Sequence, residues 1–564
     1  MAKLRADKND LFINPYNFVS LTSGVDRKNI ADECGDEKLT GYVVCTLKVQ
    51  DMLALPDRSL EDKNMPRSYD FYKIDGKPVI PGSEIRGCIR SVFEAITPSC
   101  FSVINGNVLT NRVSRPENGG KPGVLEYNRS KKRWELYKAE RYGKRKDGID
   151  ADIVRNWKPF KREGRCESYF YKTSNEPIFH PTDAQVENLK EILDIYKDYN
   201  ANNSKFSEHL DETKRNLYNK NKIAVFYLLS TVKNNGTEKD VLKYFSPAQI
   251  GRNMYVNTIP DLLGEHNKCS GKEGYCPACR LFGTLGENSP IASKIRFGDA
   301  TEKKNVVIAE NYINLPELST PKITSVEFYT RKSNDENTTN INIWNYDSEY
   351  VLLRGRKFYF HSAPKSEEEL GKRSIATKPA LKDSEFTFKL YFDKISKKEL
   401  KQLLWVLTLG ENDINGKYMH KIGVGRPVGY GSVKIVVDDI ITRKISSEKE
   451  YKIKRESYTE YDISDDLFIN SENNDVKKAF HDLKLITDYD YVNGFKVEYP
   501  IADSGNNKEK SKKASFQWFT ANRKGRKFQY ILPQLSEKSD TLLLPAMKAS
   551  SDSTQPNEKN STKK

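Results

Sequence analysis

Two β-α units, which lie far apart in this 564-residue chain, predict an α+β fold. The first opens with a strand over Gly41–Gln50, and the second with a strand over Glu385–Asp393. A long polar segment, roughly residues 100 to 260, separates the two units. We therefore expect one ferredoxin-like β-α-β-β-α-β domain over residues 41–440, split by this insertion, with two independent domains as the alternative.

The first unit combines a half-buried strand with an amphipathic helix. Along the strand, apolar residues alternate with mostly polar ones: Val43, Cys45, Leu47 and Val49. The helix is predicted to start with Ser83 as its cap and to end before Pro98. Its apolar face repeats every three or four residues: Ile85, Cys88, Ile89, Val92, Phe93 and Ile96. Arg86 and Arg90 share another face near the helix start, where free N–H groups favour an anion.

The second unit has the same order of elements. Its strand alternates apolar residues in the same way: Phe386, Phe388, Leu390 and Phe392. Ser396 and Glu399 form a capping box, and Gly410 is expected just after the helix. The apolar helix face comprises Leu400, Leu403, Leu404 and Leu407. After a turn, a further strand is expected over Ser432–Asp438.

A glycine-rich loop, residues 421–431, comes directly before that last strand. Its glycines are Gly423, Gly425, Gly429 and Gly431. Such density permits positive φ and a close backbone approach to a ligand, and Lys421, Arg426 and Lys434 add positive charge. The loop is no Walker loop, because no GK[ST] and no helix follow, and it precedes its strand, unlike a dinucleotide fingerprint. It indicates a cradle for a nucleic-acid backbone; the alternative is a glycine-rich hairpin turn.

The remaining segments carry weaker patterns. Strands are expected in Ser293–Ala300, Ile323–Thr330 and Val351–His361, and helices over Glu187–Tyr199 and Phe206–Tyr218 of the insertion. Outside the main domain we expect three further parts: an N-terminal segment over residues 1–40, a C-terminal extension over 441–545 and a disordered tail over 546–564.

Positive charge is concentrated in two segments. The net charge is +15, and residues 129–165 hold 14 lysines and arginines against six acidic residues, while residues 508–527 hold eight against one. Aromatic residues lie among these charges: Trp134, Tyr137, Tyr142, Trp157, Phe160, Phe516, Trp518 and Phe519. Basic and aromatic residues together are typical of single-stranded nucleic-acid binding. The alternative is that the aromatics form a local core.

The chain has no long apolar run and no secretory pattern at its start, so neither a membrane span nor a signal peptide is expected. Eight cysteines in so long a chain do not suggest a disulfide framework. We expect a cytoplasmic protein.

Four residues between positions 266 and 279 have the spacing of a metal site. His266, Cys269, Cys276 and Cys279 form an H-x2-C-x6-C-x2-C pattern. Imidazole and thiolate suit a tetrahedral Zn²⁺ with a structural role. The alternative is a reduced loop without metal.

Catalytic candidates are few. His420 adjoins the glycine-rich loop, where a general acid or base could act on RNA, and Asp51 and Asp57 lie between the first strand and helix, where a metal could bind. The sequence has no H-E-x-x-H, G-x-S-x-G or Walker motif. The alternatives are a solvated turn histidine and a solvated acidic loop.

Four segments together resemble a known family: IPGSEIRGCIRSVFEAI, CPACRLFGT, KIRFGDA and GVGRPVGYGSVKI. Their order is similar to that in the RAMP superfamily of type III CRISPR systems, over roughly residues 40 to 440. The resemblance implies an RRM-like, ferredoxin-like fold, RNA binding and membership of an antiviral effector ribonucleoprotein. The chain is about twice as long as a typical backbone subunit and looks more like the larger type III-associated RAMP proteins.

The resemblance also implies roles for particular residues. The segment Ser83–Arg90 and the glycine-rich loop would face crRNA. An acidic residue after the first strand, here Asp51 or Asp57, would cut target RNA with a divalent metal such as Mg²⁺, although the loop DMLALPDRSLEDKN departs from the usual pattern.

The sequence thus predicts an RNA-binding subunit or accessory of a type III CRISPR complex, with crRNA, target RNA and other subunits as partners. One alternative is a metal-independent endoribonuclease that processes precursor crRNA, with His420 or a nearby lysine as general acid or base. The other is a protein-interaction scaffold that binds no RNA.

Overall fold

The computed structural model forms two compact units, unit 1 from residues 1–106 and 259–564 and unit 2 from residues 107–258. It describes residues 4–29, 38–58, 67–104, 109–112, 120–157, 166–199, 204–234, 237–247, 252–255, 257–285, 290–318, 323–333, 339–371, 374–445, 451–469, 473–503 and 514–549. Each unit contains sheets and helices, so the predicted α+β class is confirmed.

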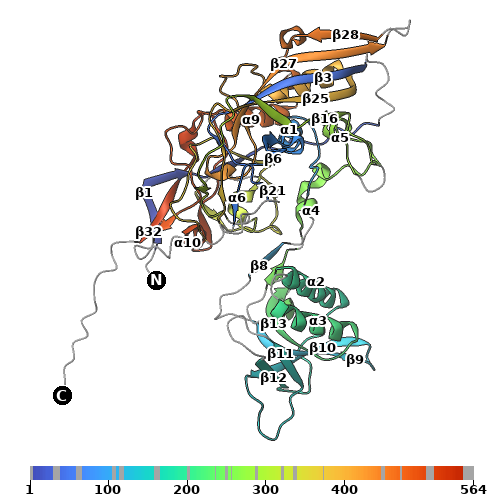
Figure 1. Ribbon diagram of the computed structural model, residues 1–564. Coiled ribbons are helices and arrows are strands. Elements are labelled where there is room, and N and C mark those ends of the chain that lie inside the picture. The colour runs from blue at the N-terminus through green and yellow to red at the C-terminus, as the bar shows by residue number, and fades with distance from the viewer. Residues whose placement is uncertain are drawn as a thin grey trace, which may run out of the picture. The chain divides into compact units, whose positions relative to one another are not determined.

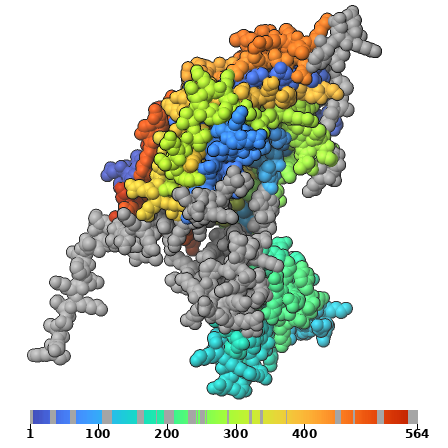
Figure 2. Space-filling model, in the orientation of Figure 1, coloured from blue at the N-terminus to red at the C-terminus, as the bar shows by residue number. Residues whose placement is uncertain are grey.

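The main sheet of unit 1 brings together strands from both ends of the sequence (Figure 1). Its order is β26-β27-β3-β25-β17-β7-β6, with β28 on β27 and β16 on β25. The long central strand β3 pairs antiparallel with both β25 and β27, so Cys45 lies opposite Phe388 on one side and Val437 on the other. Figure 2 shows the same neighbours at the surface, with blue β3 between gold β25 and orange β27. The strands are β3 (Lys38–Val49), β6 (Lys73–Ile74), β7 (Lys77–Ile80), β16 (Ile295–Phe297), β17 (Ala300–Lys304), β25 (Glu385–Ser396), β26 (His420–Lys421), β27 (Ser432–Ile445) and β28 (Tyr451–Glu456).

Helices α1 (Gly82–Ile96) and α7 (Lys397–Thr408) contact strands of this sheet, and α9 (Asn474–Thr487) packs on α1. Helix α7 contacts β25 and β27, and α1 contacts both α7 and α9. The predicted capping box of α7 is confirmed, since Glu399 N–H donates to Ser396 Oγ and Ser396 N–H donates to Glu399. The predicted Ser83 cap of α1 is wrong: the helix begins at Gly82, whose N–H donates instead to Asp299 Oδ1 at 2.7 Å.

Further short elements complete unit 1. Strand β1 pairs with β32, so residues 546–549 of the predicted tail are in a strand, and residues 550–564 lie outside the described part. The predicted strand over Ile323–Thr330 is wrong, because Val326–Tyr329 forms helix α6. The elements are β1 (Leu4–Ile13), β2 (Tyr16–Val19), β4 (Met52–Leu53), β5 (Ser68–Tyr69), α4 (Ile259–Leu263), η3 (Gly264–His266), α5 (Pro277–Phe282), β18 (Ile313–Asn314), α6, β19 (Thr330–Lys332), β20 (Thr339–Asn342), β21 (Val351–Leu353), β22 (Arg356–Tyr359), β23 (Ala376–Thr377), β24 (Ala380–Leu381), η4 (Arg426–Val428), η5 (Tyr458–Tyr461), α8 (Asp466–Ile469), β29 (Ala502–Asp503), α10 (Ala514–Asn522), β30 (Arg523–Lys524), β31 (Lys527–Tyr530), η7 (Ser539–Leu542) and β32 (Leu543–Ala549).

Unit 2 is built on a six-stranded sheet of order β11-β12-β10-β9-β13-β14. Helices α2 and α3, both expected from the sequence, pack against each other and against strands of this sheet. Strands β8 and β15 form a separate pair. The elements are β8 (Thr110–Arg112), β9 (Lys121–Asn128), β10 (Arg133–Tyr142), β11 (Ile153–Trp157), β12 (Cys166–Lys172), α2 (Asp183–Tyr199), α3 (Ser204–Tyr218), β13 (Ile223–Asn234), β14 (Thr237–Ser246) and β15 (Arg252–Met254).

Within the described part of the chain, no helix is long and apolar enough to cross a membrane.

Candidate functional site

The glycine-rich loop folds tightly onto unit 1 before β27 begins. Gly425 and Gly429, both left-handed, flank the short helix η4. At Gly429 a Cβ would lie 2.3 Å from the Ala363 carbonyl oxygen, and at Gly431 it would lie 1.9 Å from the Ile422 carbonyl oxygen. These close approaches, together with positive φ, explain glycine at both positions within the protein itself.

The three cations of the loop lie in different surroundings. Lys421 Nζ donates to the carbonyls of Gly429 and Tyr430, and burial lowers the pKa of Lys421 to about 7. Lys434 is buried and contacts Glu411 at 3.0 Å. Arg426 is exposed, and its guanidinium lies over the ring of Tyr359 at 5.5 Å. Lys421 and Lys434 therefore hold protein groups, while Arg426 faces solvent.

Helix α1 is tied to the loop on one side and to α5 on the other. Glu84 Oε1 accepts a hydrogen bond from Gly423 N–H at 2.8 Å. Arg86 Nη2 donates to the Phe282 carbonyl at 2.6 Å, and both Arg86 and Arg90 lie over the Phe282 ring. The predicted anion-facing arginines thus point towards the end of α5, while Ser83 and Gly87 are exposed on α1.

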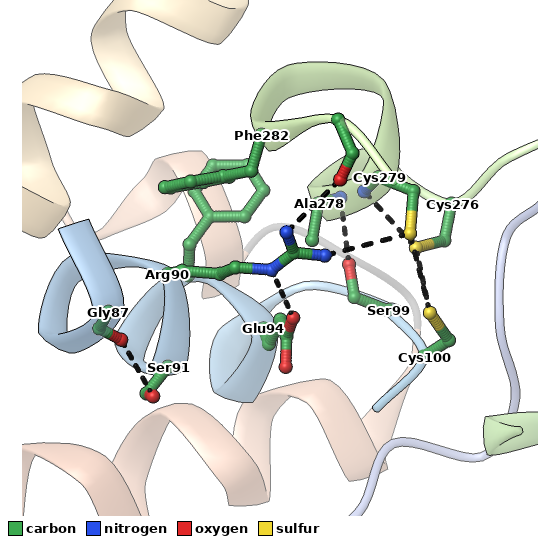
Figure 3. Close-up of polar contacts among 12 residues, drawn as sticks. Gly87, Arg90, Ser91, Glu94, Ser99, Cys100, Cys276, Ala278, Cys279 and Phe282 are labelled. Atoms are coloured by element: carbon green, nitrogen blue, oxygen red, sulfur yellow. Dashed lines mark hydrogen bonds and ion pairs between the residues drawn. The ribbon is translucent and has the colours of Figure 1, made fainter. Parts of the chain in front are cut away.

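Arg90 connects α1 to a group of sulfur atoms, as Figure 3 shows. Its Nε forms an ion pair with Glu94 at 2.8 Å, its Nη1 donates to the Gly283 carbonyl, and its Nη2 lies 3.8 Å from Cys279 Sγ. Glu94 also pairs with buried Arg356 at 3.0 Å. The Arg356 guanidinium donates in turn to the carbonyls of Ser99 and Cys100. This network holds the segment that follows α1 in place beside α5.

Four buried cysteines form a candidate metal centre: Cys100, Cys269, Cys276 and Cys279. Their sulfur atoms lie within 4.8 Å of one another, with Cys100 Sγ 3.5 Å from Cys279 Sγ and 3.6 Å from Cys276 Sγ. Ser99 Oγ accepts a hydrogen bond from Ala278 N–H at 3.1 Å, which holds Cys100 in place (Figure 3). Four convergent thiols fit the donor set of a tetrahedral metal site. The group could therefore bind a metal.

Cys100 takes the place that the sequence analysis assigned to His266. The His266 ring is buried, and its Nε2 lies 3.2 Å from Thr22 Oγ1. Burial is the main cause that lowers the pKa of His266. The helical turn η3 ends at His266, so this residue precedes the loop that brings the cysteines together and contacts the N-terminal segment instead.

The three catalytic candidates have separate surroundings. His420 is buried, with Nε2 3.0 Å from the Leu407 carbonyl, and burial lowers the pKa of His420 to about 4. Asp51 accepts from the Tyr489 hydroxyl at 2.7 Å through Oδ1. Asp57 is only 6 % exposed. The burial of His420 and Asp57 limits their access to an RNA strand.

A cavity of about 250 Å³ lies between α1, β22 and the glycine-rich loop. It brings together four residues that the sequence analysis selected, Ser83, His420, Lys421 and Arg426, and adds Lys357 of β22. This is where the predicted RNA-facing segments meet.

Several aromatic residues of the two basic segments are core residues. Trp134, Tyr137 and Trp518 are buried, the last completely, whereas Phe516 is 72 % exposed. For these three buried rings the local-core alternative holds. Residues 158–165 and 508–513 of the basic segments, with Phe160 among them, lie outside the described residues.

A family model described as the RAMP superfamily matches residues 61–434, about two thirds of the chain. The chain belongs to the RAMP superfamily. Comparison with curated proteins gives no match.

Two solved structures are similar to this RAMP protein at low identity. Csc2 of Thermofilum pendens is 12 % identical, with 82 % of this chain and 90 % of that chain covered and a TM-score of 0.23. A chain of the type III-B Cmr-beta complex bound to cognate target RNA is 11 % identical, with 71 % and 98 % covered and a TM-score of 0.18.

Two residues of the site in this RAMP protein, Cys100 and Lys357, are not predicted from the sequence. Cys100 lies just beyond the end of α1, and the sequence signal for it is a cysteine close to the end of a predicted amphipathic helix. Lys357 stands in the basic and aromatic run RGRKFYFH, where the hint was a lysine between arginine and tyrosine.

Proposed function

We propose that this RAMP protein is an RNA-binding subunit or accessory of a type III CRISPR antiviral effector complex. Its partners would be crRNA, target RNA and other subunits of the complex, in the cytoplasm. The observation that supports this best is the meeting of α1 and the glycine-rich loop at one cationic cavity, in a chain of the RAMP superfamily. Nucleic-acid phosphates are bound by cationic side chains and by backbone N–H groups at the start of helices.

The sheet order supports a ferredoxin-like, RRM-like domain as the framework of this function. In chain order the elements are β3, α1, β17, β25, α7 and β27, which is a β-α-β-β-α-β arrangement. In the sheet these strands lie in the order β27-β3-β25-β17. The first turn of α1 contacts the loop through Glu84 and Gly423, and β26 leads into the same loop at Lys421.

Some of the predicted RNA-facing residues would contact RNA, and the others would hold the loop and helix α1 in position. Ser83 and Arg426 are exposed at the cavity and would contact the phosphate backbone. The other loop residues would shape the loop and not contact RNA. The backbone packs closely against the protein at the glycines, and two lysine ammonium groups bond to protein oxygens: Gly423, Gly425, Gly429, Gly431, Lys421 and Lys434. Arg86 and Arg90 would act indirectly, by fixing α1 against α5.

We infer that the four-cysteine group binds a structural zinc ion. The fit rests on four buried sulfur atoms within 4.8 Å of one another and on Arg90, which offsets negative charge near Cys279. With four protein ligands, zinc would cross-link the segment after α1 to the loop before α5 and supply no catalysis.

The test is purification of the protein from its native host at moderate salt, followed by sequencing of any bound RNA. Short RNAs with a uniform 5′ end and a CRISPR repeat-derived tag are the expected result. Absence of RNA, or random RNA, would overturn crRNA binding and favour the scaffold alternative. A matched pair of variants, Arg426→Ala and Arg443→Ala, adds a control, because both guanidinium groups lie over a tyrosine ring and are exposed. Only Arg426→Ala should lose RNA.

Cleavage stays a prediction for Asp51, Asp57 and His420. Metal-dependent cleavage of target RNA that Asp57→Ala or Asp51→Ala abolishes would support it. Cleavage in EDTA that His420→Ala abolishes would instead support the processing alternative.

A further inference from the structure

Two arginine side chains meet on one face of the unit 2 sheet. Strand β12 lies between β11 and β10 in this sheet (Figure 1). Arg155 of β11 stands opposite Ser168 of β12. Arg141 of β10 stands opposite Phe170, two residues further along β12. Opposite residues of antiparallel strands share a face, as do residues two apart, so all four side chains lie on one face. Arg141 donates to Ser168 Oγ from Nε at 3.1 Å and from Nη2 at 3.0 Å, so the two arginines flank Ser168.

The neighbouring acidic residues do not offset these two charges. Glu140 and Glu167 are the acidic residues nearest to the pair along β10 and β12. Each stands one position before a residue of the arginine face, so the alternation of side chains places both carboxylates on the other face. Within the described part of the chain, no carboxylate forms an ion pair with Arg141 or Arg155. The arginine face therefore carries positive charge that no protein group neutralises.

Arg155 supplies a second, independent observation. Its side chain is half-buried, and its Nε is a buried donor without a hydrogen-bond partner. Burial, and then the charge of Arg141, lower the pKa of Arg155 to about 9. A buried donor without an acceptor is unfavourable, and so are two like charges side by side. A bound anion would satisfy the donor and offset both charges.

Arg141 is held in position by the aromatic core of unit 2. Its guanidinium lies 5.9 Å from the centre of the Phe226 ring, and that ring contacts the Phe170 ring edge to face at 6.0 Å. Both phenylalanines are buried. The rings and Ser168 together fix the guanidinium before any ligand arrives, which lowers the entropy that binding would cost.

We propose that Arg141 and Arg155 form a binding site in unit 2 for a phosphate group of a nucleic-acid strand. A planar carboxylate matches one guanidinium fork, whereas the tetrahedral oxygens of a phosphate can bridge two. Both arginines belong to the basic segment 129–165, with 14 lysines and arginines against six acidic residues, which favours a long polyanion. The choice of RNA as this strand rests on the proposed function.

The test labels the full chain with the arginine reagent phenylglyoxal and measures each modified arginine by mass spectrometry. The labelling is done with and without a short single-stranded RNA. We expect the RNA to protect Arg141 and Arg155. Arg133 is the internal control, because it is exposed and pairs with Glu135 near the other end of β10, and it should stay reactive. If Arg133 reacts in the free protein and Arg155 does not, the Arg155 group is closed to ligands and the proposal is overturned.

A matched pair of variants, Arg155→Gln and Arg133→Gln, removes one charge each from the same basic segment. In fluorescence anisotropy with labelled RNA, Arg155→Gln should weaken binding by about 10- to 100-fold, the range for loss of a hydrogen bond to a charged group. Arg133→Gln should change the affinity little. Equal losses would show that bulk charge carries the effect and would overturn the proposal. The melting temperature of Arg155→Gln should not fall, because the change removes a charge without a partner; a marked fall would assign Arg155 to the fold and overturn the site.

The same labelling separates this site from the proposed function, because Arg426 of unit 1 reports the latter. Protection of Arg426 without Arg141 and Arg155 would overturn the unit 2 site and leave the proposed function intact. Protection of Arg141 and Arg155 without Arg426 would support the site and count against RNA contact at the glycine-rich loop.

Two further probes identify the source of the anion. Protection of Arg141 and Arg155 by polyglutamate and not by RNA would indicate an acidic protein partner and overturn the proposal. Equal protection by inorganic phosphate and by RNA, at the same concentration of phosphate groups, would indicate a site for a free anion and overturn the assignment to a nucleic-acid strand.

Discussion

Arg90 Nη2 lies 3.8 Å from Cys279 Sγ, and Arg90 Nε forms an ion pair with Glu94 at 2.8 Å. One side chain thus connects the helix beside the cavity to the four-cysteine group. The same helix contacts the glycine-rich loop through Glu84 and Gly423. Changes at the cysteines should therefore alter the position of α1, and through it the loop.

Metal content should depend on Cys100 and not on His266. Cys100→Ser removes one of four convergent sulfur atoms, whereas His266→Gln changes a residue that contacts Thr22. We expect one zinc per wild-type chain by plasma mass spectrometry, the same in His266→Gln, and a strong loss in Cys100→Ser. Loss of metal in the histidine variant with full retention in the cysteine variant would contradict the four-cysteine site.

Arg90→Ala should lower the free energy of unfolding by roughly 2 to 4 kcal/mol, because it leaves buried Glu94 with one cation partner fewer and frees the Gly283 carbonyl. Urea unfolding followed by circular dichroism measures this. Arg426→Ala is the comparison, since Arg426 is exposed, and its stability should stay within about 0.5 kcal/mol of wild type. A stable Arg90→Ala protein would show that the network is dispensable.

Acid should destabilise the fold through His420. Its pKa is about 4 in the folded protein against an ordinary value of 6.5, so the unfolded chain binds more protons between these values. The stability that neutral His420 contributes is fully present above about pH 6.5 and is lost as the pH falls towards 4. The whole contribution to the free energy of unfolding is on the order of 3 kcal/mol. Melting temperatures across this range, compared between wild type and His420→Gln, should converge at low pH. Parallel curves would mean that His420 does not titrate on unfolding.

Salt should weaken RNA binding steeply if phosphates dominate the contacts. On a logarithmic plot of affinity against salt, Arg426→Ala should reduce the slope by about 1, the effect of one lost phosphate contact. Arg443→Ala should leave the slope unchanged, because Arg443 lies over Tyr42 on the main sheet. Equal slopes for wild type and Arg426→Ala would remove Arg426 from the interface.

Local patterns predicted the elements that depend on neighbouring residues. The helix α1, the capping box of Ser396 and Glu399, and helices α2 and α3 follow from periodicity and capping, which act within a few residues. The segment Ile323–Thr330 was predicted as a strand but contains α6, since a short apolar run fits both structures and its buried contacts decide between them.

The site itself needed the tertiary structure. The spacing of Cys269, Cys276 and Cys279 predicted a metal loop, but the fourth sulfur comes from Cys100, which the network of Arg356 and Glu94 holds beside that loop. Lys357 meets the Tyr16 ring because β2 pairs with β22, two strands far apart in the chain. The sequence by itself determined the class of fold and the family segments, because these depend on residues close together in the chain. Only packing between distant segments decided which side chains meet, because long-range contacts have no local signal.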